Sequence, residues 1–338
     1  MRFDRVFVES VAYALPQEVI TTDSIEASLA PTFQRLGLAR GLVEGLTGIR
    51  ARRFWGEGTA PSQAATLAAQ RALAEAGLEP RLLGALISTS VCKDYLEPST
   101  ACLVHGNLGL PETCLNFDIG NACLGFLSGI STVANMIEIG QIEAGIVVAG
   151  EDSRRVTLST LAALQSPYTD FQRIRDNLAT LTLGSGAAAM VLVHERHARV
   201  GHRLIGGVSL AATEFNRLCV GTETSMTTEP AVLLREGVRL AVRTWLGLRE
   251  ILGPRVDRIA EYALHQVGKA NHDAVISALG LPADRALRIY PDLANLGAAG
   301  VPVTLARCVE LGRLRAGEVV ALMGIGSGLN CSMMAVEW

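Results

Sequence analysis

The chain has 338 residues, of which 49% are hydrophobic, 5% aromatic and 19% charged, and its formal net charge is −3. A charge this close to zero gives no electrostatic case for binding nucleic acid or an anionic membrane, and no apolar run approaches the ~20 residues that span a bilayer. Charges interrupt the first residues and no apolar signal-peptide core follows, so we expect a cytoplasmic protein without a transmembrane segment.

In the first half of the chain, candidate strands and helices alternate. Apolar runs rich in β-branched residues predict strands over 83–91, 114–119 and 146–149. A long helix with apolar periodicity is predicted over about 122–139. This βαβα order favours a mostly parallel sheet. The segment at about 154–178 breaks the pattern with polar and Pro-containing sequence, and we interpret it as an insertion that caps a substrate channel or lies at a dimer interface.

The second half repeats the same theme. Strands are predicted over 259–264, 319–323 and 329–336, around helices such as 232–248. Apolar residues make up about half of the chain and few of them are aromatic, which is typical of strands covered by helices on both faces. The sequence therefore predicts a large, well-buried α/β protein.

A local repeat relates the two halves. The segments 140–148 and 312–320 are similar and lie 172 positions apart, and Cys123 and Asn295 are separated by the same offset. A thiol and an amide at equivalent points of two related halves indicate one active site on a pseudo-twofold axis.

We therefore divide the chain into two pseudo-repeated halves. Residues 1–197, with the insertion at about 154–178, form the first, and residues 198–338 form the second. A length of 338 residues fits such a fused pair.

The chain contains seven cysteines, an odd number, and none has CxxC spacing. Neither a disulfide framework nor a metal site is indicated, and we expect no bound cofactor. Only Cys123 has a context that suggests chemistry, because it lies where a predicted strand gives way to a helix. Unpaired N–H groups and the positive end of the dipole at a helix start favour a thiolate. The alternative is that Cys123 simply packs between helix and sheet.

Two further polar residues lie at comparable junctions. His265 follows an apolar strand, where a lone histidine is more often a hydrogen-bonded core residue. Asn295 is also compatible with a helix N-cap. Together with Cys123, however, both fall at strand-to-helix junctions on one edge of a doubled α/β layer, which is where such sheets bind ligands.

With Cys123, His265 and Asn295 at these positions, the sequence resembles the thiolase superfamily, in particular the ketosynthase III-like condensing enzymes. The motifs that carry this resemblance, in the expected order, are Thr47-Gly48-Ile49-Arg50, the turn around Cys123, His265-Gln266, Asn295 and Gly324-Ile325-Gly326-Ser327-Gly328. Within this group, residues 94–100, 121–126 and 326–333 look like the OleA family, whose members join two fatty acyl thioesters head to head.

The resemblance implies a five-layer αβαβα thiolase-like fold and a homodimer. Cys123 matches the acyl-accepting nucleophile, and His265 and Asn295 match the pair that holds a thioester carbonyl as it becomes an enolate. Ser327 matches the position whose backbone N–H, with that of Cys123, forms the oxyanion hole. Glu97 matches a carboxylate that reaches across the dimer interface toward the partner's cysteine.

Glu97 decides between two kinds of condensation. A decarboxylating enzyme obtains its carbanion by losing carbon dioxide from a malonyl group, whereas two unactivated acyl thioesters require removal of an α-proton by a base. Without the resemblance, Glu97 is an ordinary surface or helix-start carboxylate.

The resemblance thus implies a non-decarboxylative Claisen condensation of two fatty acyl-CoAs to a 2-alkyl-3-oxo acid, by a ping-pong route through an acyl-cysteine. This would be the first step of head-to-head hydrocarbon or β-lactone biosynthesis, with downstream pathway enzymes as possible partners. One alternative is a decarboxylative 3-oxoacyl-carrier-protein synthase III that uses a malonyl extender. Another, of a different class, is a Cys-His-Asn thioesterase or other hydrolase.

Several positions depart from the relatives. Ala294 stands where a Gly commonly precedes the Asn, and Gly300 replaces a frequent Ser. Leu42 and Leu46 stand where ketosynthase III enzymes clamp CoA with a Trp and an Arg. No second Cys occupies residues 324–328, which argues against a degradative thiolase.

Overall fold

A nine-stranded sheet organises the protein, whose computed structural model describes all residues 1–338. The strand order is β11-β12-β13-β8-β1-β7-β6-β4-β5. The strands of this sheet are β1 (Val6–Ala14), β4 (Leu83–Ser88), β5 (Leu115–Asp118), β6 (Ala144–Glu151), β7 (Gly186–His194), β8 (His202–Ala211), β11 (Ile259–Leu264), β12 (Val319–Gly326) and β13 (Asn330–Glu337). Two small ribbons pair β2 (Glu18–Thr21) with β3 (Ala51–Phe54) and β9 (Cys219–Gly221) with β10 (Met226–Thr228).

The sheet consists of two parts with the same connectivity. The order β1-β7-β6-β4 in the first part corresponds to β8-β13-β12-β11 in the second. In each part the last pair is parallel and the other two pairs are antiparallel. The parts join through a short antiparallel pairing of β1 with β8. Strand β5 has no counterpart and forms a free edge of the first part.

The expectation of a mostly parallel sheet is wrong. Only β4-β5, β4-β6 and β11-β12 are parallel, and the other five neighbouring pairs are antiparallel. The predicted strands all exist, but β1, β7 and β8 were not recognised, and these form the antiparallel centre of the sheet. Partners such as Val6 and His194 lie far apart in sequence, so the order of elements along the chain does not show that they pair.

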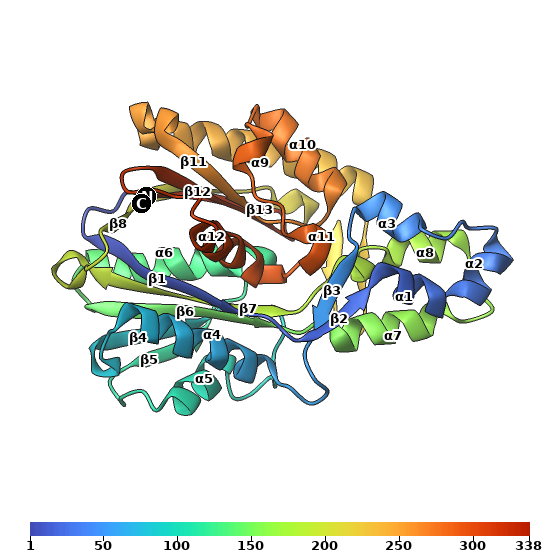
Figure 1. The fold of residues 1–338 in the computed structure, drawn as a ribbon, viewed down its shortest axis with the longest axis horizontal. Coiled ribbons are helices and arrows are strands. Elements are labelled where there is room, and N and C mark those ends of the chain that lie inside the picture. Colours follow the sequence, from blue (N-terminus) through green and yellow to red (C-terminus); the bar gives the residue numbers. More distant parts are fainter.

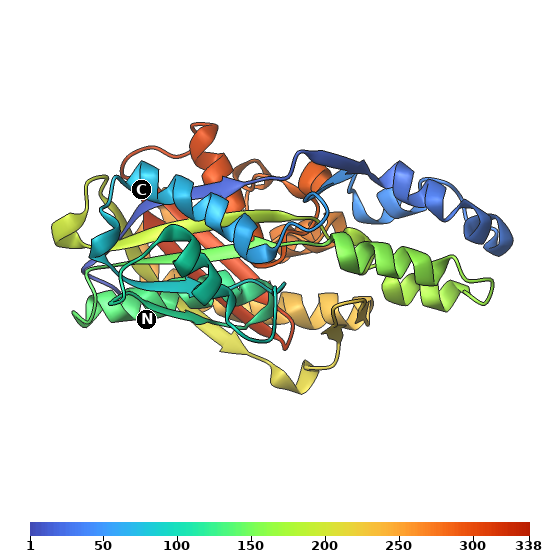
Figure 2. The same ribbon diagram turned by 90° about the horizontal axis from the view of Figure 1, so that it is seen from below.

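Helices fill the remaining layers. In Figure 1, α6 (Gly125–Glu138) and α12 (Gly300–Glu310) lie between the two parts of the sheet, and Figure 2 shows the same ribbon from below. The outer face of the first part is covered by α4 (Pro61–Ala76) and α5 (Thr100–Leu108), and that of the second by α9 (Pro230–Leu252) and α10 (Lys269–Leu279). The arrangement is the predicted five-layer αβαβα fold, which is confirmed.

The central layer holds the largest core. A cluster of 35 buried residues includes Phe126, Ile130 and Val133 of α6 and Val303 and Leu305 of α12. Full burial of each such side chain stabilises the fold by about 1.5–3 kcal/mol. Because α6 and α12 begin at the carboxyl ends of strands, this packing also fixes the segments that precede them.

The insertion at about 154–178 forms α7 (Arg154–Leu164) and α8 (Phe171–Asn177). It packs with α1 (Thr22–Ser28), α2 (Ala30–Leu36) and α3 (Leu42–Thr47) in a lobe at the right of Figure 1. Eight buried apolar residues hold this lobe together. Its role as a channel cap or interface stays a prediction.

No helix is both long and apolar enough to cross a bilayer.

Candidate active site

The turn that carries Cys123 is tightly packed. After β5 the chain enters the 3-10 helix η2 (Ala122–Leu124), which leads directly into α6. Ala122 has a left-handed φ of 46°, uncommon for a residue with a side chain. A Cβ on Gly125 would lie 2.6 Å from the carbonyl oxygen of Thr89, so the helix start is pressed against the segment that follows β4. Cys123 is therefore held on a sharp, constrained turn.

Two asparagines tie this turn to the glycine-rich turn between β12 and β13. Asn121 Nδ2 donates to Ser128 Oγ at 3.0 Å, and Asn330 Nδ2 donates to Asn121 Oδ1 at 3.1 Å. Asn330 is the first residue of β13, three positions after Ser327. The side-chain pair therefore sets the position of the Ser327 turn relative to Cys123.

His265 follows β11 and is fixed by its own backbone. Its N–H donates to the carbonyl oxygen of Met323 at 2.8 Å, which extends the β11-β12 pairing by one residue. Its Nδ1 atom is buried without a hydrogen-bond partner. A Cβ on Gly300 would lie 3.4 Å from this nitrogen, so the start of α12 lies directly against the ring. Burial lowers the pKa of His265 to about 4, and the imidazole is therefore neutral at pH 7.

Asn295 is 4% exposed and lies between the two parts of the molecule. Its backbone N–H donates to Thr182 O at 2.8 Å, and its carbonyl accepts from Gly184 N at 2.8 Å. The Oδ1 atom accepts from Gly297 N at 3.0 Å, a turn that precedes the short 3-10 helix η8 (Gly297–Ala299). The N-cap of η8 is Leu296, so the N-cap interpretation of Asn295 is wrong. No protein group accepts from Nδ2, which leaves both of its N–H bonds available to a ligand.

Ala294, which stands where the relatives commonly have Gly, keeps a backbone conformation typical of Gly. It ends α11 (Tyr290–Leu293) with φ 62° and ψ −158°, a conformation that favours Gly. The Asn295 turn therefore keeps a glycine-type backbone although the residue is Ala.

A buried arginine supports the 3-10 helix η3 (Thr180–Thr182) beside Asn295. Arg52 is 0% exposed; one guanidinium nitrogen donates to Thr22 Oγ1 at 2.9 Å and another to the carbonyl of Leu181. Burial lowers the pKa of Arg52 to about 10, so the group remains charged at pH 7. Sequence analysis missed this residue, because nothing in the pattern distinguishes it from the exposed Arg50 and the half-buried Arg53.

These elements meet at one place. The turn η2 packs against η8 and against β12 and β13. Cys123, His265, Asn295 and Ser327 therefore come from segments that converge at the carboxyl ends of β11 and β12. Glu97 does not join them in the single chain: it lies on the exposed loop before α5, and its carboxylate makes no hydrogen bond or ion pair.

The protonation of Cys123 differs from the sequence expectation. Burial, together with the negative charge of Glu151, raises the pKa of the Cys123 thiol to about 12. The expected thiolate is therefore wrong for the resting chain, because the thiol lies in a 3-10 turn ahead of the helix and faces a carboxylate. A neutral thiol beside neutral histidine can still react, if the proton leaves as the sulfur attacks.

Glu151, the last residue of β6, is the second residue that sequence analysis missed. It is 3% exposed, and burial raises the pKa of its carboxyl group. A signal was present: a single acidic residue ends an otherwise apolar run, Ala144–Glu151.

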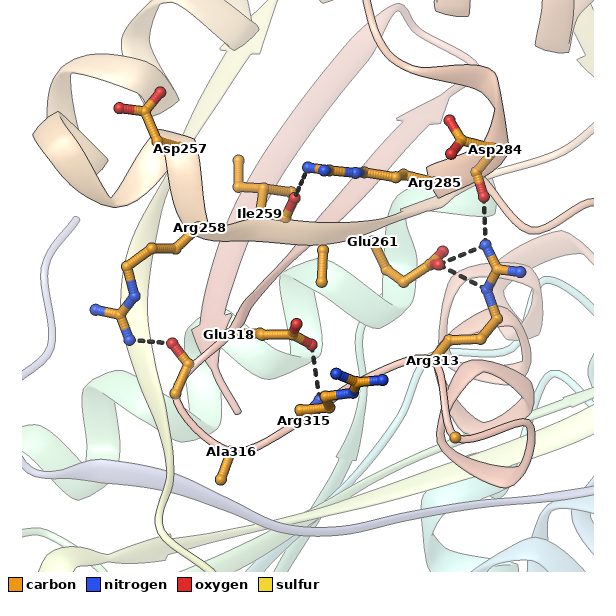
Figure 3. Close-up of a pocket in the computed structure, with 13 residues that line it drawn as sticks. Asp257, Arg258, Ile259, Glu261, Asp284, Arg285, Arg313, Arg315, Ala316 and Glu318 are labelled. Atoms are coloured by element: carbon orange, nitrogen blue, oxygen red, sulfur yellow. Dashed lines mark hydrogen bonds and ion pairs between the residues drawn. The ribbon is translucent and has the colours of Figure 1, made fainter.

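A polar groove of about 690 Å³ lies far from these residues in the fold, at the amino ends of β11 and β12. Figure 3 shows its four arginines interleaved with four acidic residues. Arg313 pairs with Glu261, and Arg285 donates to the carbonyl of Ile259 at 2.8 Å. Its arginines and its acidic residues are equal in number, so the groove carries no net formal charge. No cluster of three His, Cys, Asp or Glu side chains suited to a metal ion occurs in the chain.

A cysteine on a sharp strand-to-helix turn, with His and Asn on neighbouring turns of a doubled α/β fold, defines a thiolase-fold condensing enzyme. The family model of 3-oxoacyl-[acyl-carrier-protein] synthase III matches residues 117–206, and the model of its C-terminal part matches residues 252–338. A beta-ketoacyl-[acyl-carrier-protein] synthase III of Rhizorhabdus wittichii is 31% identical over 301 residues, covering 86% of this chain and 88% of that protein.

Two acyl-CoA:acyl-CoA alkyltransferases match over 100% of both chains. Those of Xanthomonas campestris and Shewanella oneidensis are each 40% identical. A crystal structure of cerulenin-bound Xanthomonas OleA superposes with a TM-score of 0.97, covering 100% of this chain and 98% of that chain. The chain belongs to the ketosynthase III-like condensing enzymes and, within them, to the OleA family, which confirms the resemblance seen in the sequence.

The raised pKa of Cys123 predicts how its alkylation depends on pH. Below a pKa of about 12 the thiolate fraction, and with it the labelling rate, should rise about tenfold per pH unit. The rate of iodoacetamide labelling of the Cys123 peptide, followed by mass spectrometry from pH 7 to pH 10, measures this slope. A rate that levels off near pH 8 would show that the thiol has a low pKa, and Cys123→Ala identifies the correct peptide.

Proposed function

We propose that the protein condenses two fatty acyl-CoA thioesters, without decarboxylation, to a 2-alkyl-3-oxo acid. The observation that carries this proposal is the convergence of the Cys123 turn with the His265 and Asn295 segments, in a chain 40% identical over its full length to acyl-CoA:acyl-CoA alkyltransferases. Solved structures of a Xanthomonas OleA variant with bound lauric acid and lauroyl-CoA support fatty acyl-CoA as the substrate class.

In the first step, the Cys123 sulfur attacks the carbonyl of one acyl-CoA. The thiol proton passes to the departing CoA sulfur, with neutral His265 as the group able to relay it. The bond between acyl carbon and CoA sulfur breaks, and the acyl-cysteine and free CoA are the products. The N–H groups of Cys123 and Ser327 stabilise the oxyanion, and each such donor typically contributes about 3 kcal/mol.

In the second step, the Glu97 carboxylate removes an α-proton from a second acyl-CoA. Donors on His265 and Asn295 hold the thioester oxygen as it becomes an enolate. The enolate carbon attacks the acyl-cysteine carbonyl, Cys123 leaves with its electron pair and regains a proton, and a β-ketoacyl-CoA forms. Water then cleaves the CoA thioester to give the 2-alkyl-3-oxo acid and free CoA.

Glu97 requires a second copy of the chain in this scheme. Its loop is unusually apolar for an exposed segment, since Leu96 is 94% exposed and Tyr95 62% exposed. The neighbouring free edge strand β5 exposes Leu115 and Phe117 by 47% and 37%. An unprotected apolar sheet edge is suited to pairing with another chain. We propose a homodimer across β5, with Glu97 entering the partner's active site.

The two alternatives are less well supported. A decarboxylative synthase, for which the 31% identical relative is named, gives Glu97 no task. A Cys-His-Asn hydrolase does not account for the full-length similarity to the alkyltransferases. Cytoplasmic location, expected from the sequence, also belongs to this proposal. Supply of product to β-lactone or olefin-forming enzymes belongs to it as well and rests on the family resemblance.

Product analysis separates these functions. The purified protein, given lauroyl-CoA and no malonyl donor, should form the coupled 2-alkyl-3-oxo acid, or the ketone left when that acid loses carbon dioxide, as detected by mass spectrometry. Cys123→Ser should abolish acylation. Glu97→Ala should keep acylation and lower condensation by at least about 100-fold, the smallest usual contribution of a general base.

Three outcomes would contradict the assignment. Condensation by Glu97→Ala at the parent rate would remove Glu97 as the base. Turnover only after addition of a malonyl thioester would make the protein a decarboxylative synthase. Free fatty acid as the sole product of the parent protein would make it a hydrolase.

Mixed dimers test whether Glu97 acts on the partner's site. Cys123→Ala and Glu97→Ala variants are each expected to be inactive in condensation. A heterodimer of the two contains one site with an intact Cys123 and a partner's intact Glu97, so co-expression with two affinity tags should restore up to half of the parent rate. If Glu97 acts within its own chain, the purified heterodimer stays inactive.

A further inference from the structure

Glu151 is a buried carboxylate to which the mechanism above gives no role. It ends β6, is 3% exposed, and takes part in no ion pair with Lys, Arg or His. Removing a carboxylate from water is costly unless hydrogen bonds compensate. The groups that donate to it therefore indicate what it holds in place.

Three backbone N–H groups donate to this carboxylate. Oε1 accepts from Val91 N at 2.9 Å and from Ala298 N at 3.2 Å, and Oε2 accepts from Cys92 N at 3.2 Å. Val91 and Cys92 follow β4 in the first part of the fold, whereas Ala298 lies in η8 of the second. One side chain thus bridges two segments from opposite parts of the molecule.

Both segments lead to proposed site residues. Val91 and Cys92 begin the loop that carries Glu97. Ala298 lies in the turn whose Gly297 N–H fixes the Asn295 side chain. A Cβ on Gly297 would lie 3.0 Å from the Glu151 Cδ, so the turn approaches the carboxylate as closely as a glycine permits.

The nucleophile is positioned by a different set of contacts. Asn121 and Asn330 connect the Cys123 turn to the Ser327 turn without using Glu151. Acylation requires only Cys123, His265 and the oxyanion hole. Condensation also requires Asn295 and Glu97. The two chemical steps therefore depend on separable supports.

We propose that Glu151 is a positioning residue for the condensation step: its carboxylate fixes the base of the Glu97 loop against the Asn295 turn. The inference rests on the proposed function, and Glu151 acts through these two segments without touching the substrate. Its loss lets the two segments move apart while the Cys123 turn keeps its geometry.

Glu151→Gln tests the proposal with little change in volume. The amide keeps one oxygen acceptor but turns an NH2 group toward a backbone N–H. We expect condensation of lauroyl-CoA to fall about 100-fold, the size of effect that a misplacement of about 1 Å can produce. The same change removes the negative charge that adds to burial in raising the pKa of the Cys123 thiol, so the first-turnover release of CoA, which reports Cys123 acylation, should not fall below the parent rate.

Two readouts separate positioning from a general loss of stability. The ratio of coupled product to free fatty acid comes only from folded enzyme, so it does not depend on the folded fraction, and it should fall in Glu151→Gln. Loss of deuterium from α-deuterated lauroyl-CoA should slow in the same variant, because enolate formation needs Glu97 and Asn295. Glu151→Asp, which withdraws the carboxylate by one methylene, should shift both readouts in the same direction and serves if the Gln variant does not fold.

Glu261→Gln is the matched control. Glu261 is also a buried strand carboxylate, 2% exposed, but it pairs with Arg313 in the polar groove of Figure 3, at the other end of the strands. Glu261→Gln should leave the ratio of coupled product to free fatty acid unchanged. An unchanged ratio in both Glu151 variants, or an equal decline of acylation and condensation, would overturn the positioning role. Absence of condensation by the parent protein would instead refute the proposed function.

Discussion

The site depends on how closely two helix starts approach each other between the two parts of the sheet. The turns η2 and η8, which lead into α6 and α12, pack together, and this contact sets the distance between the nucleophile and the Asn295 turn. Glycines make the approach possible. A side chain at Gly125 would collide with the Thr89 carbonyl, and one at Gly297 would meet Glu151. The buried cluster of 35 residues below the turns keeps both helices in place. Close packing of the two helix starts thus determines how near the two turns lie.

In the resting site, Cys123 and His265 are uncharged, and Glu151 is the nearby carboxylate. Burial raises the pKa of Cys123 and lowers that of His265, so both are neutral near pH 7. A neutral imidazole can donate one hydrogen bond to a developing enolate without first losing a proton. The neutral thiol is less exposed to oxidation and stray alkylation than a thiolate. Reactivity then follows substrate binding, when the proton can leave together with the attacking electron pair.

The single chain leaves the β5 edge of the sheet unpaired and apolar. Five apolar side chains are exposed along this edge and the adjoining Glu97 loop, and the Glu97 carboxylate has no partner within the chain. Pairing two copies along β5 would cover these side chains and bring the carboxylate to a site where a proton must be removed. If Glu151 holds the base of that loop, as inferred above, each chain also stabilises a group that serves its partner. Assembly and catalysis would then depend on the same few contacts.

The sequence by itself determined the strand and helix segments near the site, the internal repeat, the family and the identity of Cys123, His265 and Asn295 as candidates. Local apolar periodicity and the residue types at strand ends carry this information, because both are read over a few neighbouring residues. Tertiary structure alone decided the antiparallel pairing of β1, β7 and β8, since their partners are remote in sequence. It also decided the raised pKa of Cys123, the burial of Arg52 and the contacts of Glu151 with both parts of the fold. Desolvation and hydrogen bonding depend on groups that the fold brings together from distant positions, and no local pattern records them.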